Sequence, residues 1–524
     1  PGKGSTLSIT TPGGDEIPAV ESEPAGKLTV WFGKARQFAA SLAGRLPKNW
    51  ENWAMGAALA VYLITRLIGL GDFPIYFFTD EAVQTVLAQD FVRDGFRNYD
   101  DDLFPTYFQN VYQYNLSTSV YLQVIPYLLF GKSIEVTRGV SVLVTLLAAY
   151  WVGKILKDIF KVRFPWIGVL VLSVTPVWFL HSRTAFETAL AVTFFSGFLY
   201  YYLLYRGGSQ RAFYWAALLG ALVFYTYSPG QMIMAFSIVL LFFSDLRYHW
   251  QNRKTVLRGL LLGVILAVPY IRFQIQHPGE SLRHLTQLNS YWVQTDLTLG
   301  DKLLQFLKNY LAGLNPLYWY LPNTTDFVRH VMDSFGHLWR VFLPFGLGGI
   351  VISALRVRDT RYRTLLMALL VAPSGAALVG LEVTRALFMV IPAALLTAVA
   401  IEWTIDWLGG RVKLSRTGLG AGVSVGLAVF NVYMLINALT QGPVWFDQYG
   451  LGGLQWGAKQ VFGAVQAYQA EHPGVAFYIT PTWANGTDIL KRFFFSDSVR
   501  GIELGSIDTY INNYTAIKPD LVLV

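Results

Sequence analysis

Long apolar segments, separated by short polar ones, recur along most of the chain. A helix needs roughly 20 predominantly apolar residues to cross the hydrocarbon core of a bilayer, and most of these segments come close to that length. The pattern therefore predicts an α-helical polytopic membrane protein with about 11 transmembrane helices. The predicted spans are 53–70, 138–156, 164–180, 186–205, 212–228, 230–246, 256–275, 338–355, 363–381, 385–405 and 417–439.

One apolar segment, residues 119–130, is too short to be a span. If it crossed the membrane, the basic clusters between the later segments would all lie outside, against the positive-inside rule. We therefore interpret it as a re-entrant or interfacial helix of the first outer loop, and we expect the N-terminus in the cytoplasm. The basic clusters that this topology places inside are 154–163, 206–211, 247–258 and 356–363.

This topology predicts three parts of the chain. Residues 1–48 form a cytoplasmic tail and an amphipathic interfacial helix, and residues 49–440 form the transmembrane domain with long outer loops at 72–137 and 276–337. Residues 441–524 are of soluble character and are expected to form a small extracytoplasmic α/β domain. Its predicted elements are helices at 455–470 and 487–495 and strands at 475–480 and 520–524.

Composition supports a membrane protein and excludes several kinds of site. Hydrophobic residues make up 53% of the 524 residues and charged residues only 14%, whereas charged residues make up about a quarter of an ordinary soluble domain. The chain has no cysteine, which excludes disulfides, thiolate metal sites and cysteine nucleophiles. Because the basic residues of the net +8 charge fall between apolar segments, they indicate topology, and we expect no nucleic-acid partner.

Ionisable and polar residues from several separate loops converge on the predicted outer face. Asp80 and Glu81 follow the first span, and Arg385 opens a late one. No phosphate-binding glycine loop is evident. If the protein transfers a group, the donor is therefore expected to be attached to a membrane lipid. The other outer-face candidates are His181, Arg183, Glu187 and Tyr227.

An ordered set of short motifs resembles one enzyme family. The motifs are Arg66 near the end of the first span, FTDEAVQ, YLQVIPYLLFG, TRGVSVL, HSRTAFE and TRALFMVIPAALL. This succession, which covers about residues 50–405, is similar to the GT-C fold of polyprenyl-phosphate-sugar-dependent glycosyltransferases. In particular it resembles family 39, which includes protein O-mannosyltransferases and the aminoarabinose transferases of lipid A.

The resemblance implies that Asp80 is the principal catalytic carboxylate and Glu81 its neighbour. Glycosyl transfer to a hydroxyl needs a base at the acceptor proton, so we expect Asp80 to act as general base in a single inverting displacement. Glu81 either holds Asp80 or the acceptor in place or raises the proton affinity of Asp80. The alternative for both acids is an ordinary acidic first turn of the helix that follows.

Two arginines are candidates for binding the donor phosphate, because a guanidinium forms forked hydrogen bonds to phosphate oxygens. For Arg183 the alternative is an ordinary position at the lipid headgroups, and for Arg385 it is an ion pair with Glu382. Glu187 is a possible second acid, although the family more often carries Asp one residue later, and it could instead pair with Arg183. His181 and Tyr227 are expected to line the substrate site, or else to pack at the membrane boundary.

The sequence thus predicts an integral-membrane glycosyltransferase of the cell membrane. Its expected partners are a polyprenyl-phosphate-linked sugar donor, membrane lipids and a hydroxyl acceptor of unknown identity. No cofactor is expected, and no metal is assigned because the sequence shows no spaced His/Asp cluster, although a divalent cation is not excluded. The alternatives are oligosaccharyl transfer from a polyprenyl-diphosphate donor, a lipid transporter and an inactive assembly subunit.

Overall fold

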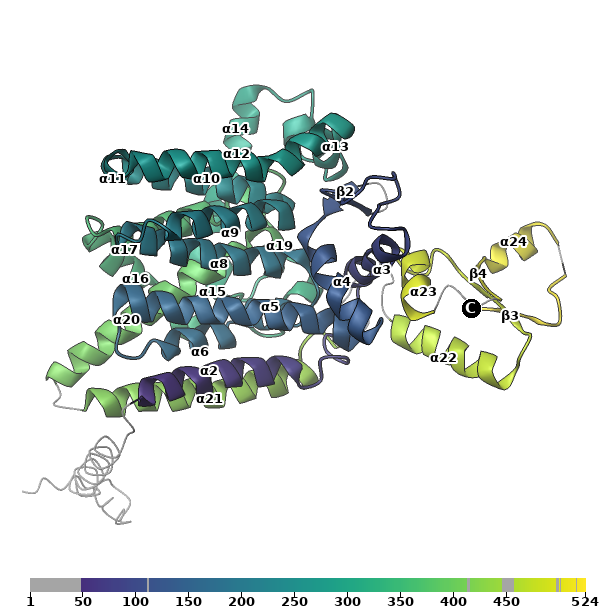
Figure 1. Cartoon of the computed structure of the whole chain (residues 1–524). Coiled ribbons are helices and arrows are strands. Elements are labelled where there is room, and N and C mark those ends of the chain that lie inside the picture. The colour runs from purple at the N-terminus through teal and green to yellow at the C-terminus, as the bar shows by residue number, and fades with distance from the viewer. Residues whose placement is uncertain are drawn as a thin grey trace, which may run out of the picture.

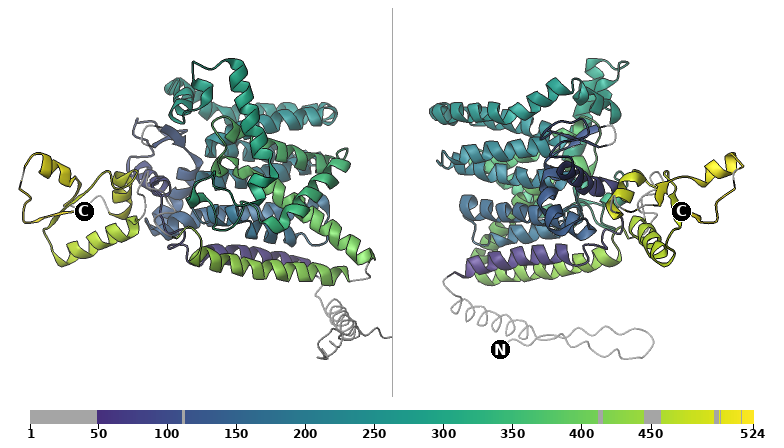
Figure 2. Two further views of the ribbon diagram at one scale, coloured as in Figure 1. Left: turned by 180° about the vertical axis from the view of Figure 1, so that it is seen from behind. Right: turned by 45° about the vertical axis from the view of Figure 1, so that its right-hand side comes forward.

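The computed structural model describes residues 49–110, 113–411, 415–444, 457–495, 499, 501–514 and 516–524. The interfacial helix predicted within residues 1–48 lies outside these ranges. Figure 1 shows helices running side by side in a bundle, with α3, α4 and the C-terminal elements gathered at one end. Two further views in Figure 2 show the C-terminal elements at the same end of the bundle.

Each predicted span coincides with one helix or with a helix that is interrupted. The segment predicted at 164–180 is broken at Thr175, because Pro176 has no N–H to continue the first piece. The helices are α2 (Trp50–Leu67), α5 (Ile134–Lys154) with the π turn Ile155–Phe160, α6 (Trp166–Val174), α7 (Pro176–His181), α8 (Glu187–Arg206), α9 (Ala212–Thr226), α10 (Ser228–Ser244), α11 (Leu246–Gln251), α12 (Arg253–Gln276), η4 (Arg340–Phe342), α16 (Leu343–Leu355), α17 (Thr360–Val371), α18 (Ser374–Ala377), α19 (Val383–Ala386), η5 (Leu387–Met389), α20 (Val390–Arg411) and α21 (Arg416–Thr440).

Among the described residues, five helices are long and apolar enough to cross a membrane. The most apolar windows of Glu187–Arg206 and Val383–Arg411 are both 89% buried, whereas that of Arg253–Gln276 is only 11% buried. Helices that are apolar on every face belong in a protein interior, so α8 and α20 form the centre of the bundle and α12 lies at its edge. The predicted number of about 11 spans stays a prediction, since several of the helices are short or interrupted.

The short apolar segment forms α4 (Thr118–Phe130), which has 13 residues. At 1.5 Å per residue its length is roughly 20 Å, well short of a hydrocarbon core of about 30 Å. Its C-terminal end lies beside the C-terminal part of the chain, because Lys132 donates hydrogen bonds to the carbonyls of Arg492 and Phe495. Helix α4 therefore stays at the same end of the bundle as α3 (Figure 1), and its relation to a membrane stays a prediction.

The two long loops carry structure of their own. The first contains α3 (Thr79–Arg93), the antiparallel pair β1 (Phe108–Asn110) and β2 (Gln113–Leu116), and α4. The second contains α13 (Glu280–Gln287), η2 (Tyr291–Val293), α14 (Leu299–Leu314), α15 (Pro316–Tyr320) and η3 (Val328–His330).

The described residues after α21 form a small parallel sheet with three helices. The strand order is β4–β3–β5, and β4 and α24 are elements that the sequence did not predict. Phe77, Ala82 and Val86 of the α3 region share one hydrophobic cluster with residues of this part, among them Phe462 and Phe493. The elements are α22 (Ala458–Glu471), β3 (Ala476–Ile479), α23 (Thr487–Phe494), β4 (Ile502–Leu504), α24 (Ile507–Asn512) and β5 (Leu521–Leu523).

Candidate active site

Asp80 lies at the second position of α3, where the partial positive charge of a helix N-terminus favours an anion. Its side chain is exposed, yet the surrounding protein desolvates it enough to raise the pKa of the carboxyl above its ordinary value. The charge of Arg329 opposes this shift, and the charge of Glu81 adds to it. Asp80 is thus an exposed carboxylate that the surrounding protein partly desolvates.

Glu81 is completely buried and holds the segment that carries Asp80. Its carboxylate forms a two-point ion pair with Arg138, with Oε2–Nε at 2.8 Å and Oε1–Nη2 at 2.9 Å. It also accepts hydrogen bonds from the backbone N–H groups of Phe78 and Ala185. Both carboxylate oxygens are therefore occupied by hydrogen-bond donors. This geometry suits the expected role in which Glu81 holds Asp80 in place, and that role stays a prediction.

Arg138 is a residue of the site that the sequence pattern did not single out, although it lies within the motif TRGVSVL. Its side chain is fully buried and donates hydrogen bonds to the carbonyls of Leu70, Pro74 and Tyr76, at 3.0, 3.1 and 2.7 Å. One guanidinium thus ties the whole turn before α3 to α5.

The motifs FTDEAVQ and HSRTAFE contact each other directly. Ala185 donates its N–H to Glu81 at 2.9 Å and accepts from the Gln84 amide at 2.5 Å. Because of this pairing, Glu187 at the start of α8 lies close enough to Asp80 for the two charges to interact. Tyr227 in turn lies within electrostatic range of Glu187 and Arg385. Four of the predicted residues, Asp80, Glu187, Tyr227 and Arg385, therefore lie near one another.

Arg385 is only partly accessible and forms an ion pair with Glu382 at 3.2 Å, which was the alternative considered for it. Helix α19, which carries Arg385, is tied to α8 by a hydrogen bond of 2.8 Å from the Thr188 hydroxyl to the Thr384 carbonyl. This bond keeps Arg385 beside Glu187 and Tyr227.

Arg183 is fully buried and donates its hydrogen bonds to backbone carbonyls. The acceptors are Thr65, Arg66 and Ile68, at 2.8, 2.9 and 2.7 Å. These are carbonyls at the end of α2 that have no partner within the helix. Arg183 therefore caps the C-terminal end of α2. This geometry does not favour the predicted role of Arg183 in binding phosphate, which stays untested. Nor does Arg183 form an ion pair with Glu187 within the part of the chain that the structure describes.

The second long loop supplies residues that no sequence pattern revealed. Arg329 and His330 belong to η3, and His330 stacks on His181 with ring centroids 5.4 Å apart. Desolvation lowers the pKa of His330 well below its ordinary value, as do the nearby charges of His181 and Arg329. The His181 ring is completely buried, with Nδ1 at 2.8 Å from the Val177 carbonyl.

Asp326 joins this loop to α19. Its Oδ2 lies 2.9 Å from Nε2 of His337 and its Oδ1 accepts the Val383 N–H at 2.7 Å. Although desolvation opposes it, hydrogen bonding from His337 and Val383 holds the pKa of Asp326 below its usual range. The anchor keeps the η3 turn, and hence Arg329, near the start of α19.

Comparisons with known proteins bear on the fold of the chain. Residues 118–273 match the family model described as dolichyl-phosphate-mannose-protein mannosyltransferase. No curated protein sequence matches the chain.

Solved structures match nearly the whole chain at low identity. The crystal structure of ArnT from Cupriavidus metallidurans in the apo state has a TM-score of 0.55 at 12% identity, covering 90% of this chain and 95% of that one. The same protein bound to undecaprenyl phosphate gives 0.56 at 13% identity, covering 90% and 96%. The apo oligosaccharyltransferase of Archaeoglobus fulgidus gives 0.51 at 15% identity, covering 91% of this chain but only 61% of that one.

The fold expected from the motifs is thereby confirmed. With its long apolar helices and these similarities, the chain is a multi-pass membrane protein with the GT-C fold.

Proposed function

We propose that this protein is an integral-membrane glycosyltransferase that moves a sugar from a polyprenyl-phosphate carrier to a hydroxyl acceptor on the outer face of the membrane. The family match and the fold support this class of reaction. The observation that carries the assignment is Asp80, an exposed but partly desolvated carboxylate next to the buried Glu81–Arg138 pair. Asp80 also lies within electrostatic range of Arg329.

The proposed chemistry is a single displacement. Asp80 takes the proton of the acceptor hydroxyl, whose oxygen attacks the anomeric carbon of the donor. The bond between that carbon and the phosphate oxygen breaks, and polyprenyl phosphate leaves with the bonding electron pair. A raised pKa suits Asp80 to this task, because a base works best when its pKa lies near the working pH. Attack from the side opposite the phosphate inverts the anomeric configuration.

Arg385 and Arg329 are the residues that we propose for the departing phosphate. Both belong to segments that Asp326 and Thr384 hold close to Asp80 and Glu187. Guanidinium groups placed where negative charge develops stabilise the transition state more than the ground state. Glu187 is proposed as a second acid that orients the acceptor, and Tyr227 and His181 as the walls of the site.

The lipid part of the donor has a candidate site in the bundle. An apolar cavity of about 570 Å³ lies between α8, α9, α10 and α12. Tyr225, which lines it, is two residues from Tyr227. An isoprenoid chain gains roughly 0.8 kcal/mol for each methylene-sized group that it buries in such a space. We propose that part of the carrier lipid lies in this cavity.

The sidedness belongs to the same proposal. Residues 1–48 are assigned to the cytoplasm, residues 49–440 to the transmembrane domain, and residues 441–524 to a domain on the outer face. Asp80 and the C-terminal residues share one end of the molecule, because the Thr79 hydroxyl donates to the Asn485 carbonyl.

The direct test is transfer of a radiolabelled sugar from a polyprenyl-phosphate donor by the purified protein in lipid vesicles. Asp80→Asn is expected to lower the rate by a factor of about 100 or more, since general-base catalysis contributes roughly 10²–10⁴-fold. Asp94→Asn, at the other end of the same helix, is the matched control and should keep full activity. An Asp80→Asn protein that folds and transfers sugar at the normal rate would refute the assignment. A polyprenyl-diphosphate donor tested in parallel separates this reaction from oligosaccharyl transfer.

A further inference from the structure

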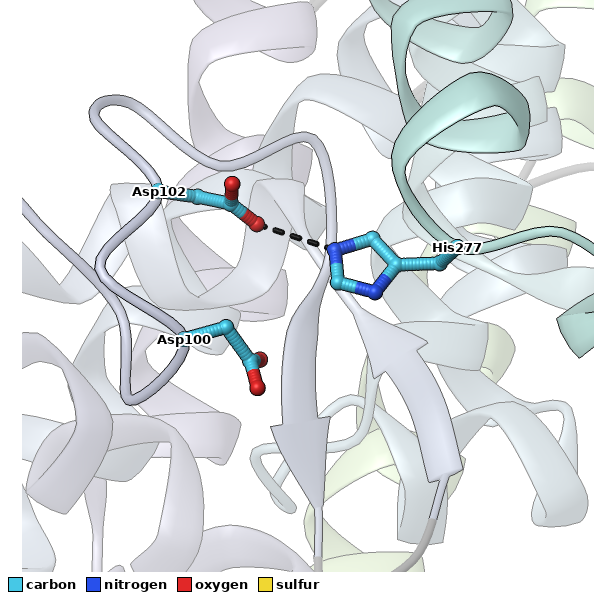
Figure 3. Close-up of side chains that lie close together, drawn as sticks. All are labelled: Asp100, Asp102 and His277. Carbon is cyan, nitrogen blue, oxygen red and sulfur yellow. Dashed lines mark hydrogen bonds and ion pairs between the residues drawn. The ribbon is translucent and has the colours of Figure 1, made fainter.

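Asp100, Asp102 and His277 form a cluster outside the proposed active site. Asp100 and Asp102 lie in the first long loop, and His277 follows the last residue of α12 (Figure 3). One ligand atom from each of the three lies within 4.8 Å of the others. Oδ2 of Asp102 is already 2.9 Å from Nε2 of His277.

The loop presents the two carboxylates to the same side. The Asn98 side chain accepts the N–H groups of Asp100 and Asp102 at 3.1 and 2.9 Å, which closes a tight turn around them. Asp101, between them, has a positive φ of 66° and forms an ion pair with Arg97. The middle acid is therefore paired with Arg97 and not with the cluster.

The charge of Asp100 and Asp102 is not balanced in the same way. Within the described ranges, neither residue forms an ion pair with a lysine or arginine, and the Asp100 carboxylate accepts a hydrogen bond from Tyr114 at 2.6 Å. The nearby Arg272 donates to the carbonyls of Leu103 and Phe104 instead. Two carboxylates and one imidazole that converge without a fixed cation are a donor set for a divalent ion.

We propose that Asp100, Asp102 and His277 bind one divalent cation of the zinc class, with water completing the coordination. Zinc–oxygen and zinc–nitrogen bonds of about 2.0–2.2 Å place the donor atoms of one ion roughly 3–3.5 Å apart. The Asp102–His277 pair, at 2.9 Å, is close to such a spacing, and a ligand atom of Asp100 lies within 4.8 Å of both. An imidazole ligand favours zinc over calcium or magnesium, which prefer oxygen donors alone.

The ion would clamp the first long loop to the end of α12. That end already contacts the loop through the Thr106 hydroxyl, which donates to the Pro269 carbonyl at 2.7 Å, and through Tyr107, which packs on Phe273. Among the five described helices that are long and apolar enough to cross a membrane, α12 has the least buried window, so a metal ion there would fix an element at the edge of the bundle. This inference does not depend on the proposed transfer reaction.

The experiment compares four versions of the full-length, untagged protein in detergent after removal of metal with a chelator. These are the wild type, Asp100→Asn/Asp102→Asn, His277→Gln and the control Asp101→Asn, which removes one carboxylate from the same loop without touching the cluster. Zinc binding is measured by titration calorimetry and by metal analysis after gel filtration, and cobalt is added as a spectroscopic probe of the ligand set.

The wild type and Asp101→Asn should each bind one zinc ion and gain melting temperature on adding it. The double variant and His277→Gln should bind zinc at least about tenfold more weakly and show no such gain. Their melting temperatures without metal report whether they fold, and single Asp100→Asn replaces the double variant if that one does not. Equal zinc binding by all versions, or no zinc binding by the wild type, would overturn the proposal and leave the Asp102–His277 contact as a hydrogen bond only.

Discussion

The Glu81 carboxylate and the Arg138 guanidinium form a two-point ion pair in which both side chains have no exposed surface. Glu81 is the residue immediately after Asp80, and Arg138 also binds three carbonyls of the turn before α3. Water cannot replace either partner at this depth. The position of Asp80 therefore depends on a pair of charges that must stay together.

Glu81→Gln should destabilise the protein strongly. Removing one partner of a buried ion pair leaves the other charge uncompensated, which costs about 3–5 kcal/mol. We expect a lower melting temperature and a lower kcat, because Asp80 loses its support. Glu280→Gln breaks the Glu280–Arg283 pair, in which the Arg283 side chain is 55% exposed, and serves as the control. Equal effects of the two variants on melting temperature would argue against a structural role for the buried pair.

The pH profile of transfer should report the raised pKa of Asp80. A general base must be deprotonated, so kcat/KM should rise with pH through that pKa, above the ordinary aspartate value of about 3.9. Arg329→Gln removes a charge that lowers this pKa, and should move the acidic limb to still higher pH. Lys308→Gln, on α14, is the control. An unchanged acidic limb in Arg329→Gln would mean that another group sets it.

The same shift predicts that Asp80→Asn stabilises the protein. Folding raises the pKa of the Asp80 carboxyl, because its charged form is desolvated only in the folded protein. The protein therefore loses stability as the pH rises from the pKa of Asp80 in the unfolded chain to its pKa in the folded protein. Asp80→Asn should therefore melt at a higher temperature than the wild type at neutral pH, and the difference should vanish below the unfolded pKa. Thermal melts at several pH values measure this, and a constant difference at every pH would show that desolvation of the Asp80 charge is not its origin.

The sequence predicts the helices of the bundle well but only part of the site. Apolar length and periodicity are local properties, so the positions of the spans could be read directly, and Asp80 and Glu81 stood out as acids beside a span. Arg183 shows the limit: it caps carbonyls of α2 that lie up to 118 positions away in the chain. No local pattern distinguishes such a cap from a phosphate ligand.

Arg329 and the Asp102–His277 pair were missed for the same reason. Arg329 lies in a loop with no periodic pattern, and Asp102 and His277 are 175 positions apart. The sequence contains a run of three aspartates at 100–102, but no pattern in it indicates that this run lies close to His277. The packing of Tyr107 and Tyr114 on Phe273, near the end of α12, brings these side chains together.

Two substitutions that should compensate for each other, one at Gly486 and one at Thr79, test whether the C-terminal residues support the proposed active site. Gly486 has a φ of +74°, and an added Cβ would lie 2.4 Å from Cγ2 of Thr79, next to Asp80. Gly486→Ala should therefore lower both the melting temperature and kcat. Thr79→Ser keeps the hydroxyl that donates to Asn485 but removes the methyl group, so the double variant should recover part of the loss.

The control for this pair is Gly474→Ala. Gly474 also has a positive φ, +99°, but nothing lies within 4 Å of an added Cβ. Its replacement should show backbone strain of about 1–2 kcal/mol without a loss of kcat. If Thr79→Ser gives Gly486→Ala no recovery, the contact with α3 is not the cause of the defect.

Filling the apolar cavity should weaken donor binding without changing the chemistry at Asp80. Gly263 of α12 lines the cavity, and an added Cβ there meets no atom within 4 Å. A phenyl ring at this position can therefore enter the space without distorting the helix. Gly263→Phe is expected to raise KM for a donor with a long isoprenoid chain at least several-fold while leaving kcat near normal, because the catalytic groups are untouched. A donor with a shortened isoprenoid chain should show a smaller increase in KM.

Gly426→Phe on α21 is the control for this variant, because an added Cβ at Gly426 also meets no atom within 4 Å. If both variants leave KM unchanged for the long donor, the cavity does not hold the carrier lipid, and the proposed role of Asp80 is unaffected.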